Sequence, residues 1–398
     1  MSGTSTPGLD ARSLAKAGIA ALQQGNAGKA RELFERIATA GLADASICVA
    51  LALACRTLKD PAAALAAVDR ALALEPRDLR ALVMKADQLA EMGDPRAAAS
   101  FYRAAVNVAP PEDQIPADLR DELAHAQAMG ERYAAEFDSY LRQRLLPSGG
   151  AKERATRRFR DALDIMTGAK KTFLQQPRQF YFPELPQIQF YDRHEFPWLD
   201  ELEAASADIR AELGEVLKED SAFQPYVEAH PRLPQTGYPG LLNNPAWSAF
   251  YLWKHGEIVP ENARRCPRTV KALASAPFAA VRGRAPSVMF SLLRPGGWIP
   301  PHTGETNARL ICHLPLIVPP GCSFRVGNEI RTWVEGEAWV FDDTIEHEAW
   351  NRGGQTRVVL LFEIWRPELT EEERHLVSSM FETIDAYSGG MPELGGKG

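Results

Sequence analysis

Cysteine is scarce in this sequence and is not arranged in pairs. The five cysteines, an odd number, include no Cys-x-x-Cys motif; they are Cys48, Cys55, Cys266, Cys312 and Cys322. This pattern argues against a disulfide framework and against a cysteine-ligated zinc cluster. We therefore expect reduced thiols, of which Cys312 and Cys322 serve in packing.

A long apolar run and an excess of positive charge are also absent. The N-terminal stretch MSGTSTPGLDARSLAKAG has no apolar signal core, and no apolar run approaches the length of a membrane span. The net charge of −7 and the pI near 5.7 argue against a general nucleic-acid binder. We expect a soluble, cytoplasmic protein with no membrane span and no nucleic-acid partner, long enough for two or three domains.

The first third of the chain repeats itself. Residues 11–44, 45–78 and 79–112 are three blocks of 34 residues that align without gaps, each with a turn at its fifteenth to seventeenth positions. Equivalent positions hold Ala30, Ala64 and Ala98, and then Phe34, Val68 and Tyr102. This pattern resembles the tetratricopeptide repeat, a helix-turn-helix unit of this period, although an alanine-rich helical bundle with accidental periodicity is an alternative. Such arrays commonly bind peptides or partner proteins on a concave face.

The residue pattern of the chain changes after the repeats. We expect a helical cap and linker over 113–180, a strand-rich domain over 181–385, and a flexible tail over 386–398. Short strands separated by Gly and Pro turns predict an antiparallel double-sheet domain of the jelly-roll type. In such folds a metal site usually lies at the strand ends that face the mouth.

A set of polar residues in this strand-rich part suggests metal chemistry. His302 in WIPPH and His347 in EHEAWN lie 45 residues apart, on different strands, and Arg357 begins the strand RVVLLFEIW. His313 and Arg309 lie on the strand between them. Imidazole suits iron, copper or zinc, and an arginine fork suits a carboxylate. Any one of these histidines alone is more simply explained by a structural role, but together the set fits a 2-oxoglutarate-dependent iron oxygenase.

At roughly 185–370 the sequence resembles the aspartyl/asparaginyl β-hydroxylase family. The resemblance is carried by WSAFYLW, SLLRPGGWIPPHTGETNARLICHLPLIVP, TWVEGEAWVFDDTIEHEAWN and RVVLLFEIWRPEL. It implies a double-stranded β-helix, or cupin-like, domain behind the repeats. It also implies an Fe(II)- and 2-oxoglutarate-dependent dioxygenase that uses O₂ to hydroxylate the β-carbon of Asp or Asn in a peptide or protein. The repeats could recruit such a substrate.

The resemblance also implies roles for single residues. His302 and His347 would hold the iron, with Gly304 at the position where many related iron sites have a carboxylate ligand. Arg357 and Ser291 would bind the distal carboxylate of 2-oxoglutarate.

By the same resemblance, His313 would contact the end of 2-oxoglutarate near the metal. Arg309 matches an arginine that holds the acidic group of the substrate. Where animal family members have a second arginine, this chain has Ile311, so an apolar surface replaces a positive charge.

Several assignments stay open at the level of sequence. Either Asp342 or Asp343 could orient a histidine, or both could belong to a turn. Glu346 and Glu348, on alternate strand positions, are expected to point away from the metal. Three tryptophans could line the pocket or belong to the core: Trp253, Trp333 and Trp350.

Three alternative functions stay open beside peptide hydroxylation. The same oxygenase chemistry could act on a lipid acyl chain or a small molecule, which Ile311 would suit. Chloride could fill an empty ligand position and give halogenation. The domain could also be a vestigial barrel in a non-catalytic repeat scaffold.

Overall fold

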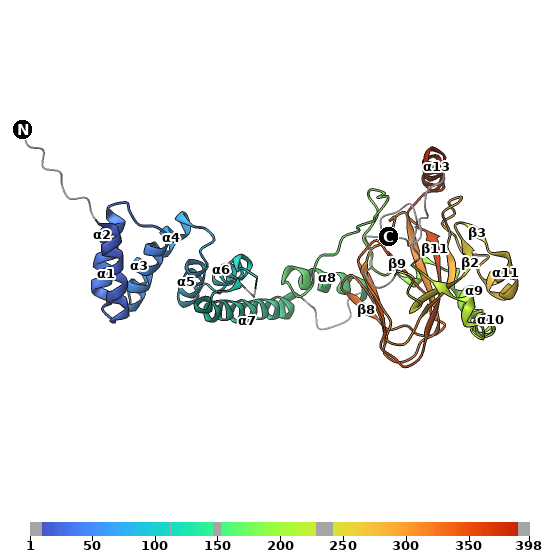
Figure 1. The fold of residues 1–398 in the computed structure, drawn as a ribbon, viewed down its shortest axis with the longest axis horizontal. Coiled ribbons are helices and arrows are strands. Elements are labelled where there is room, and N and C mark those ends of the chain that lie inside the picture. Colours follow the sequence, from blue (N-terminus) through green and yellow to red (C-terminus); the bar gives the residue numbers. More distant parts are fainter. Residues whose placement is uncertain (1–9, 112–113, 146–152, 228–241, 389–398) are drawn as a thin grey trace, which may run out of the picture. The chain divides into compact units, whose positions relative to one another are not determined.

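The chain divides into two compact units at Lys170 and Lys171 (Figure 1). The computed structural model describes residues 10–111, 114–145, 153–227 and 242–388. The part up to Lys170 is called the repeat unit, and the part from Lys171 onward the sheet unit.

Six helices of the repeat unit form three helix-turn-helix pairs, as the 34-residue period predicts. They are α1 Ala11–Gln23, α2 Ala27–Thr39, α3 Ala45–Thr57, α4 Pro61–Leu74, α5 Leu79–Glu91 and α6 Pro95–Val108. The alanines and the large side chains at the repeated positions are buried. Gly18 allows the close approach of the first pair, because a Cβ there would lie 2.5 Å from the ring of Phe34.

Each of these helices begins with a side-chain cap. The capping residues accept a hydrogen bond from the backbone three residues later, and they recur with the 34-residue period: Asp10, Asp44 and Asp78, then Asn26, Asp60 and Asp94. Caps of this kind satisfy backbone donors that the first helical turn leaves without partners. The caps explain why the helix boundaries keep the same register in all three blocks.

The array continues into a short 3₁₀ turn and two longer helices: η2 Ala117–Leu119, α7 Arg120–Leu145 and α8 Glu153–Met166. Leu123, Ala126 and Tyr133 of α7 join the core of α5 and α6. Arg142 pairs with Asp138 and Asp164 and so connects α7 with α8.

The predicted linker over 113–180 extends too far. Residues 171–180 belong to the sheet unit, where Gln176 N donates to the Thr344 carbonyl at 2.7 Å and Arg178 N donates to that of Gly304 at 3.0 Å. The predicted tail also begins too early, because α13 runs from Glu371 to Ser388. Residues 112–113, 146–152 and 389–398 lie outside the described residues.

The sheet unit contains two antiparallel sheets, as the short alternating strands predict. The larger has the order β1-β2-β4-β11-β6-β9, with β3 paired to β2; the smaller has the order β5-β10-β7-β8. The strands are β1 Gln224–Pro225, β2 Trp247–Lys254, β3 Glu257–Ile258, β4 Val288–Leu293, β5 Trp298–His302, β6 Arg309–Ile317, β7 Cys322–Val326, β8 Glu329–Arg331, β9 Trp339–Phe341, β10 His347–Asn351 and β11 Arg357–Trp365.

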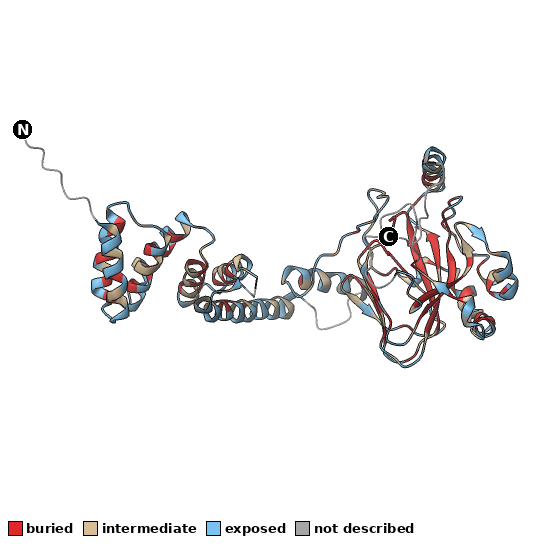
Figure 2. Cartoon of the chain, in the orientation of Figure 1, coloured by how far each residue is buried: buried red, intermediate tan, exposed pale blue. Residues whose placement is uncertain are grey.

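The larger sheet is buried on both faces (Figure 2). One face packs against α9 Leu199–Ala204 and α10 Ser206–Val216, and it presents residues such as Phe290, Cys312 and Phe362. The other face presents the alternate residues, such as Ile311 and Val359, to a second core shared with the smaller sheet. Because side chains alternate along a strand, each central strand supplies both cores, and its burial is continuous.

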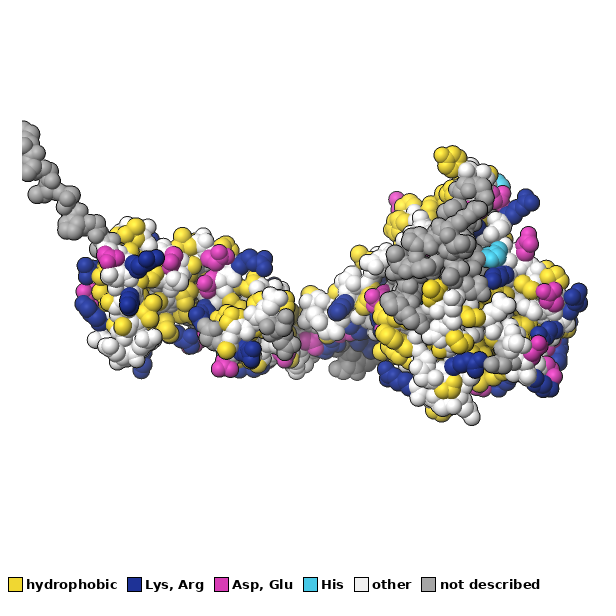
Figure 3. Space-filling view, in the orientation of Figure 1, with side chains coloured by type: hydrophobic (Ala, Val, Ile, Leu, Met, Phe, Trp, Pro, Cys, Tyr) yellow, Lys and Arg dark blue, Asp and Glu magenta, His cyan; other side chains and the backbone are white. Residues whose placement is uncertain are grey.

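The helices α11 Pro260–Arg265 and α12 Pro267–Ala272 follow β3, and α13 packs through Val377 and Phe381 against Val281 and Leu369. No helix among the described residues combines the length and the apolar character needed to cross a membrane. On the face shown in Figure 3, side chains of both charge signs lie interspersed on each unit.

Candidate active site

A cavity lies between the two sheets and collects the polar residues singled out from the sequence. His302 and His347 come from β5 and β10, and Ser291, His313 and Arg357 come from β4, β6 and β11. Arg309 lines the same cavity. Along β6 and β11, the residues that line the cavity lie an even number of positions apart, because alternate side chains of a strand point to the same face of the sheet.

His302 and His347 face each other directly across the β5–β10 pair. Their ring centroids are 4.0 Å apart. His302 Nδ1 lies 2.8 Å from the Pro300 carbonyl oxygen, and His347 Nδ1 lies 3.1 Å from that of Ile345. Since a carbonyl only accepts, each Nδ1 carries the hydrogen, and the lone pair of each neutral ring is on Nε2.

The surroundings keep both rings neutral. Burial lowers the pKa of His347 to about 4. Burial, followed by the neighbouring His347, lowers the pKa of His302 well below its ordinary value. Two neutral imidazoles with adjacent lone pairs are a donor set that suits iron, copper or zinc.

The described residues offer no third protein ligand of the usual kind. Among the residues that the structure describes, no group of three or more His, Cys, Asp or Glu side chains is placed to hold a metal ion. The space beside Gly304 is instead filled by Asp343, since a Cβ on Gly304 would lie 2.0 Å from Asp343 Oδ2. The carboxylate of Asp343 therefore lies where a longer side chain at position 304 would begin.

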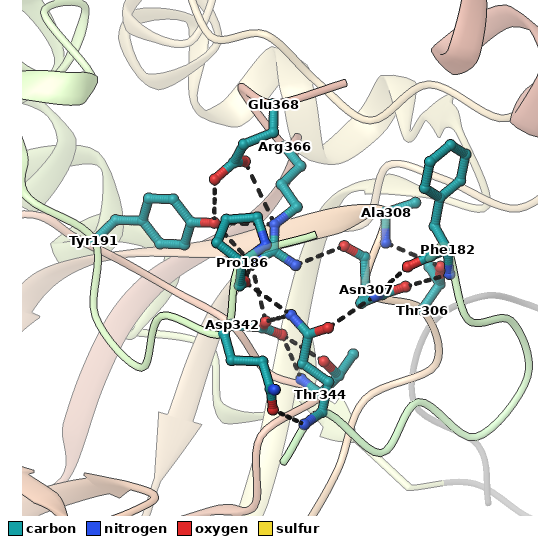
Figure 4. A network of polar contacts seen from close by, with 12 residues as sticks. Phe182, Pro186, Tyr191, Thr306, Asn307, Ala308, Asp342, Thr344, Arg366 and Glu368 are labelled. Atoms are coloured by element: carbon teal, nitrogen blue, oxygen red, sulfur yellow. Dashed lines mark hydrogen bonds and ion pairs between the residues drawn. The ribbon is translucent and has the colours of Figure 1, made fainter. Parts of the chain in front are cut away.

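The two neighbouring aspartates have different surroundings. Asp342 is fully buried in a structural network, where it accepts from Thr344 N at 3.0 Å and Gln175 Nε2 at 2.7 Å and pairs with Arg366 (Figure 4). Asp343 lines the cavity and accepts from Arg309 Nη1 at 3.0 Å. Of the two, Asp343 is the one beside the histidine pair.

The same network connects the beginning of the sheet unit to the strands of the site. Arg366 donates to the carbonyl oxygens of Asn307 and Pro186 and to the hydroxyl of Tyr191 (Figure 4). Asn307 in turn donates to Gln175 and Phe182. This network holds the turns that follow His302 and precede His347.

Arg357 is buried, and the part of the chain that the structure describes supplies no counter-charge for it. It is 2% exposed, its Nε has no hydrogen-bond partner, and no described carboxylate lies within ion-pair distance. Burial lowers its pKa to about 10. Its guanidinium stacks on Trp333 at 4.8 Å from the ring centroid.

Other polar atoms without partners gather on the same side. His313 Nδ1 and Trp333 Nε1 are buried and have no hydrogen-bond partner among the described residues. Burial, together with the nearby Arg357, lowers the pKa of His313 well below its ordinary value. Ser291 accepts from Trp247 Nε1 at 3.2 Å. Buried groups without partners are rare in folded proteins and commonly mark a place for a ligand.

Trp247 was not assigned to the site from the sequence, and Trp333 was left open between a place in the pocket and a place in the core. Their polar nitrogens contribute here, but tryptophans in strand-rich segments are usually core residues, so no sequence signal separated them from the rest. Trp253 packs with the core on the helix-covered face. Glu346 and Glu348 pair with Arg325, away from the histidine pair, as the alternation of β10 predicts.

Arg309 differs from Arg357 because it is already paired. It lies near Asp343 and within 3.2 Å of Glu363 Oε1, and it is 4% exposed. Burial acts to lower its pKa, but Asp343 and Glu363 outweigh that effect and raise it.

Two segments of the chain match models of known protein families. Residues 203–367 match the family model described as Aspartyl/Asparaginyl beta-hydroxylase, and residues 45–78 match that of the tetratricopeptide repeat. Residues 203–367 are therefore similar to an aspartyl/asparaginyl β-hydroxylase domain, and this segment is called the hydroxylase domain. This hydroxylase domain contains both histidines, Arg357 and the cavity-facing strands of both sheets.

Three known proteins are similar to this chain over the region of the hydroxylase domain. Human aspartate beta-hydroxylase domain-containing protein 2 is 32% identical over 211 residues, which cover 52% of this chain and 55% of that protein. Human aspartyl/asparaginyl beta-hydroxylase is 38% identical over 129 residues, covering 32% and 17%. The ornithine lipid ester-linked acyl 2-hydroxylase of Rhizobium tropici is 36% identical over 189 residues, covering 47% and 63%. The chain therefore spans less than two thirds of the length of each of these relatives.

Proposed function

We propose that the hydroxylase domain is an Fe(II)- and 2-oxoglutarate-dependent dioxygenase. The observation that carries this proposal is the pairing, in one cavity, of two neutral histidines with a buried arginine that lacks a counter-charge. A metal-binding oxo-acid with a distal carboxylate would satisfy both features. When bound, the iron would supply the activation of O₂, coupled to conversion of 2-oxoglutarate to succinate and CO₂.

The chain itself would bind and orient the reactants. His302 and His347 would hold the metal through Nε2, since each Nδ1 is committed to a backbone carbonyl. Arg357 and Ser291 would receive the distal carboxylate, and His313 would lie near the oxo-acid end. The apolar walls would exclude water from the reacting C–H bond.

The filled space beside Gly304 disfavours halogenation. A halide bound in place of a carboxylate ligand would need room and a positive or neutral surrounding. Here the carboxylate of Asp343 occupies the space next to Gly304 and would repel an anion. Hydroxylation therefore fits this site better than transfer of chloride.

Two substrate classes are consistent with the relatives. One relative is an aspartyl/asparaginyl beta-hydroxylase, and another is an ornithine lipid ester-linked acyl 2-hydroxylase. By the first likeness the target would be the β-carbon of an Asp or Asn side chain, with the repeat unit recruiting the protein that carries it. By the second it would be a carbon of an acyl chain, which the apolar Ile311 suits.

Succinate production by the purified full chain tests the proposal. Fe(II), ascorbate, O₂ and 2-oxoglutarate would be supplied with and without Asn or Asp peptides, beside the His347→Ala variant. We expect turnover in the wild type and none in the variant. Binding of 2-oxoglutarate to Zn(II)-loaded protein gives a separate readout, and a wild type that neither binds nor consumes 2-oxoglutarate would leave a non-catalytic scaffold.

A further inference from the structure

The cavity contains two buried arginines in opposite electrostatic states. Arg357, at the start of β11, has no carboxylate partner among the described residues. Arg309, on β6, is paired with Asp343 and Glu363. Arg357 and Glu363 are six residues apart on β11, about 20 Å at a strand's usual rise. Among the described residues, one end of the cavity therefore has an arginine without a carboxylate, and the other end has an arginine with two.

The end around Arg309 is closed to a further carboxylate. Glu363 accepts through Oε2 from Ser287 N at 2.7 Å and pairs through Oε1 with Arg309, so both of its oxygens are engaged. Arg309, Asp343 and Glu363 together carry an excess of one negative charge. An incoming carboxylate would meet like charge, or would have to displace an internal partner and leave it buried and unpaired.

The other polar pair at this end is also internal. Glu305 is 3% exposed and pairs with Arg178, and both line the cavity. The pair brings no net charge to the cavity. The pair therefore does not change the preference for an uncharged group over a carboxylate that Arg309 and its partners set.

The remaining wall at this end is apolar. Ile311 lies opposite Glu363 in the β6–β11 register, and Met289 lies opposite Leu361 in the β4–β11 register. All three apolar side chains line the cavity. An uncharged group would bury apolar surface here without breaking an ion pair.

We propose that this end of the cavity receives an uncharged part of the substrate, a carboxamide or a hydrocarbon chain, and rejects a carboxylate. Glu363 and Ile311 are then the residues that determine this specificity, the first by neutralising Arg309 and the second by supplying an apolar surface. The inference rests on the proposed function and narrows its substrate class.

Matched pairs of probes test the inference. One pair is two peptides that differ only in a central Asn or Asp, and the other is dodecanamide and dodecanoate. Two quantities are measured for each probe: the increase in succinate production, and binding to Zn(II)- and 2-oxoglutarate-loaded protein by tryptophan fluorescence. All eight tryptophans lie after residue 171, so the signal comes from the sheet unit.

In at least one pair, we expect the uncharged member to exceed its carboxylate counterpart by about tenfold or more, in stimulation of succinate production and in affinity. In Glu363→Gln the preference should fall, and in the double variant Glu363→Gln/Ile311→Arg it should reverse. Glu212→Gln is the matched control, because Glu212 is a buried, paired carboxylate on α10 outside the cavity, and it should keep the wild-type preference.

In a pair that gives a response with the wild type, a carboxylate whose binding and stimulation of succinate production equal or exceed those of its uncharged partner would overturn the inference. So would the absence of any response, in turnover and fluorescence, to both uncharged probes. Failure of the proposed function is distinguishable, because it would appear as no succinate in any arm, while the fluorescence comparison would still rank the members of each pair.

Discussion

At the scale of single residues, Arg357 shows a conflict between stability and binding. A buried charge without a partner costs folding free energy, and the depressed pKa of Arg357 has that origin. A protein under no functional constraint would gain by placing an apolar side chain there. The residue is therefore best explained by a ligand that supplies the missing anion.

The first prediction concerns Arg357→Met. We expect the ligand-free protein to unfold at a higher temperature than the wild type, while the Kd for 2-oxoglutarate rises by about 10- to 100-fold through loss of a charge-assisted contact. Thermal unfolding and 2-oxoglutarate titration of Zn(II)-loaded protein measure the two effects. Arg366→Met is the control, because Arg366 is equally buried but paired with Asp342, and its loss should lower stability. A destabilised Arg357→Met variant with unchanged affinity would contradict the prediction.

The second prediction concerns the glycine beside the histidine pair. Gly304→Ala would place a Cβ 2.0 Å from Asp343 Oδ2, so it should destabilise the sheet unit by about 1–3 kcal/mol and weaken metal binding. Urea unfolding followed by tryptophan fluorescence measures the first effect, and Zn(II) titration measures the second.

The double variant Gly304→Ala/Asp343→Gly separates crowding from other causes. Removal of the Asp343 side chain opens the space, so the double variant should recover part of the stability lost in Gly304→Ala relative to Asp343→Gly alone. Strict additivity of the two substitutions would show that Gly304 and Asp343 do not compete for the same space.

At the scale of elements, the placement of residues on separate strands and the family resemblance together predicted much of the site. His302 and His347 are far enough apart in the sequence to lie on two different strands. In the structure they are directly opposite each other in the β5–β10 pair. The family resemblance indicated the cavity set on β4, β6 and β11, and the structure brings that set together. The ion pairs of Arg309 could not be predicted, because Asp343 and Glu363 come from distant segments and any acidic residue could have filled that role.

The third prediction uses two neighbours on β11 that face opposite ways. Phe362 lies fully buried in the core under the helices, whereas Leu361 lines the cavity. Phe362→Ala should lower the free energy of unfolding by about 3–5 kcal/mol and leave the Kd for 2-oxoglutarate of the folded protein unchanged. Leu361→Ala should cost less stability and change probe binding in the cavity. Urea unfolding and fluorescence titration distinguish the two, and equal effects on both quantities would contradict the assignment of faces.

At the scale of the whole molecule, the 34-residue period predicted a helical repeat array, and the short strands that follow predicted a sheet domain after it. Both are found in this order. The division between them was misplaced by about ten residues. The segment 171–180 lacks any periodic pattern of its own, and it belongs to the sheet unit because its backbone and Gln175 are bound by residues more than a hundred positions away. Sequence-local signals do not contain such long-range partners.

The last prediction tests whether the sheet unit binds 2-oxoglutarate independently of the repeat unit. Asp78 and Asp94 cap α5 and α6, and loss of each cap costs about 1 kcal/mol. The Asp78→Ala/Asp94→Ala variant should lower the midpoint of the helical unfolding transition seen by far-ultraviolet circular dichroism. All residues that line the cavity belong to the sheet unit, so the Kd for 2-oxoglutarate should stay within about twofold of the wild type. Arg357→Met provides the opposite control, since it should change that Kd without lowering the helical transition. A cap variant with a strongly weakened Kd would show instead that the repeats act on the 2-oxoglutarate site, and that the two units do not work separately in binding.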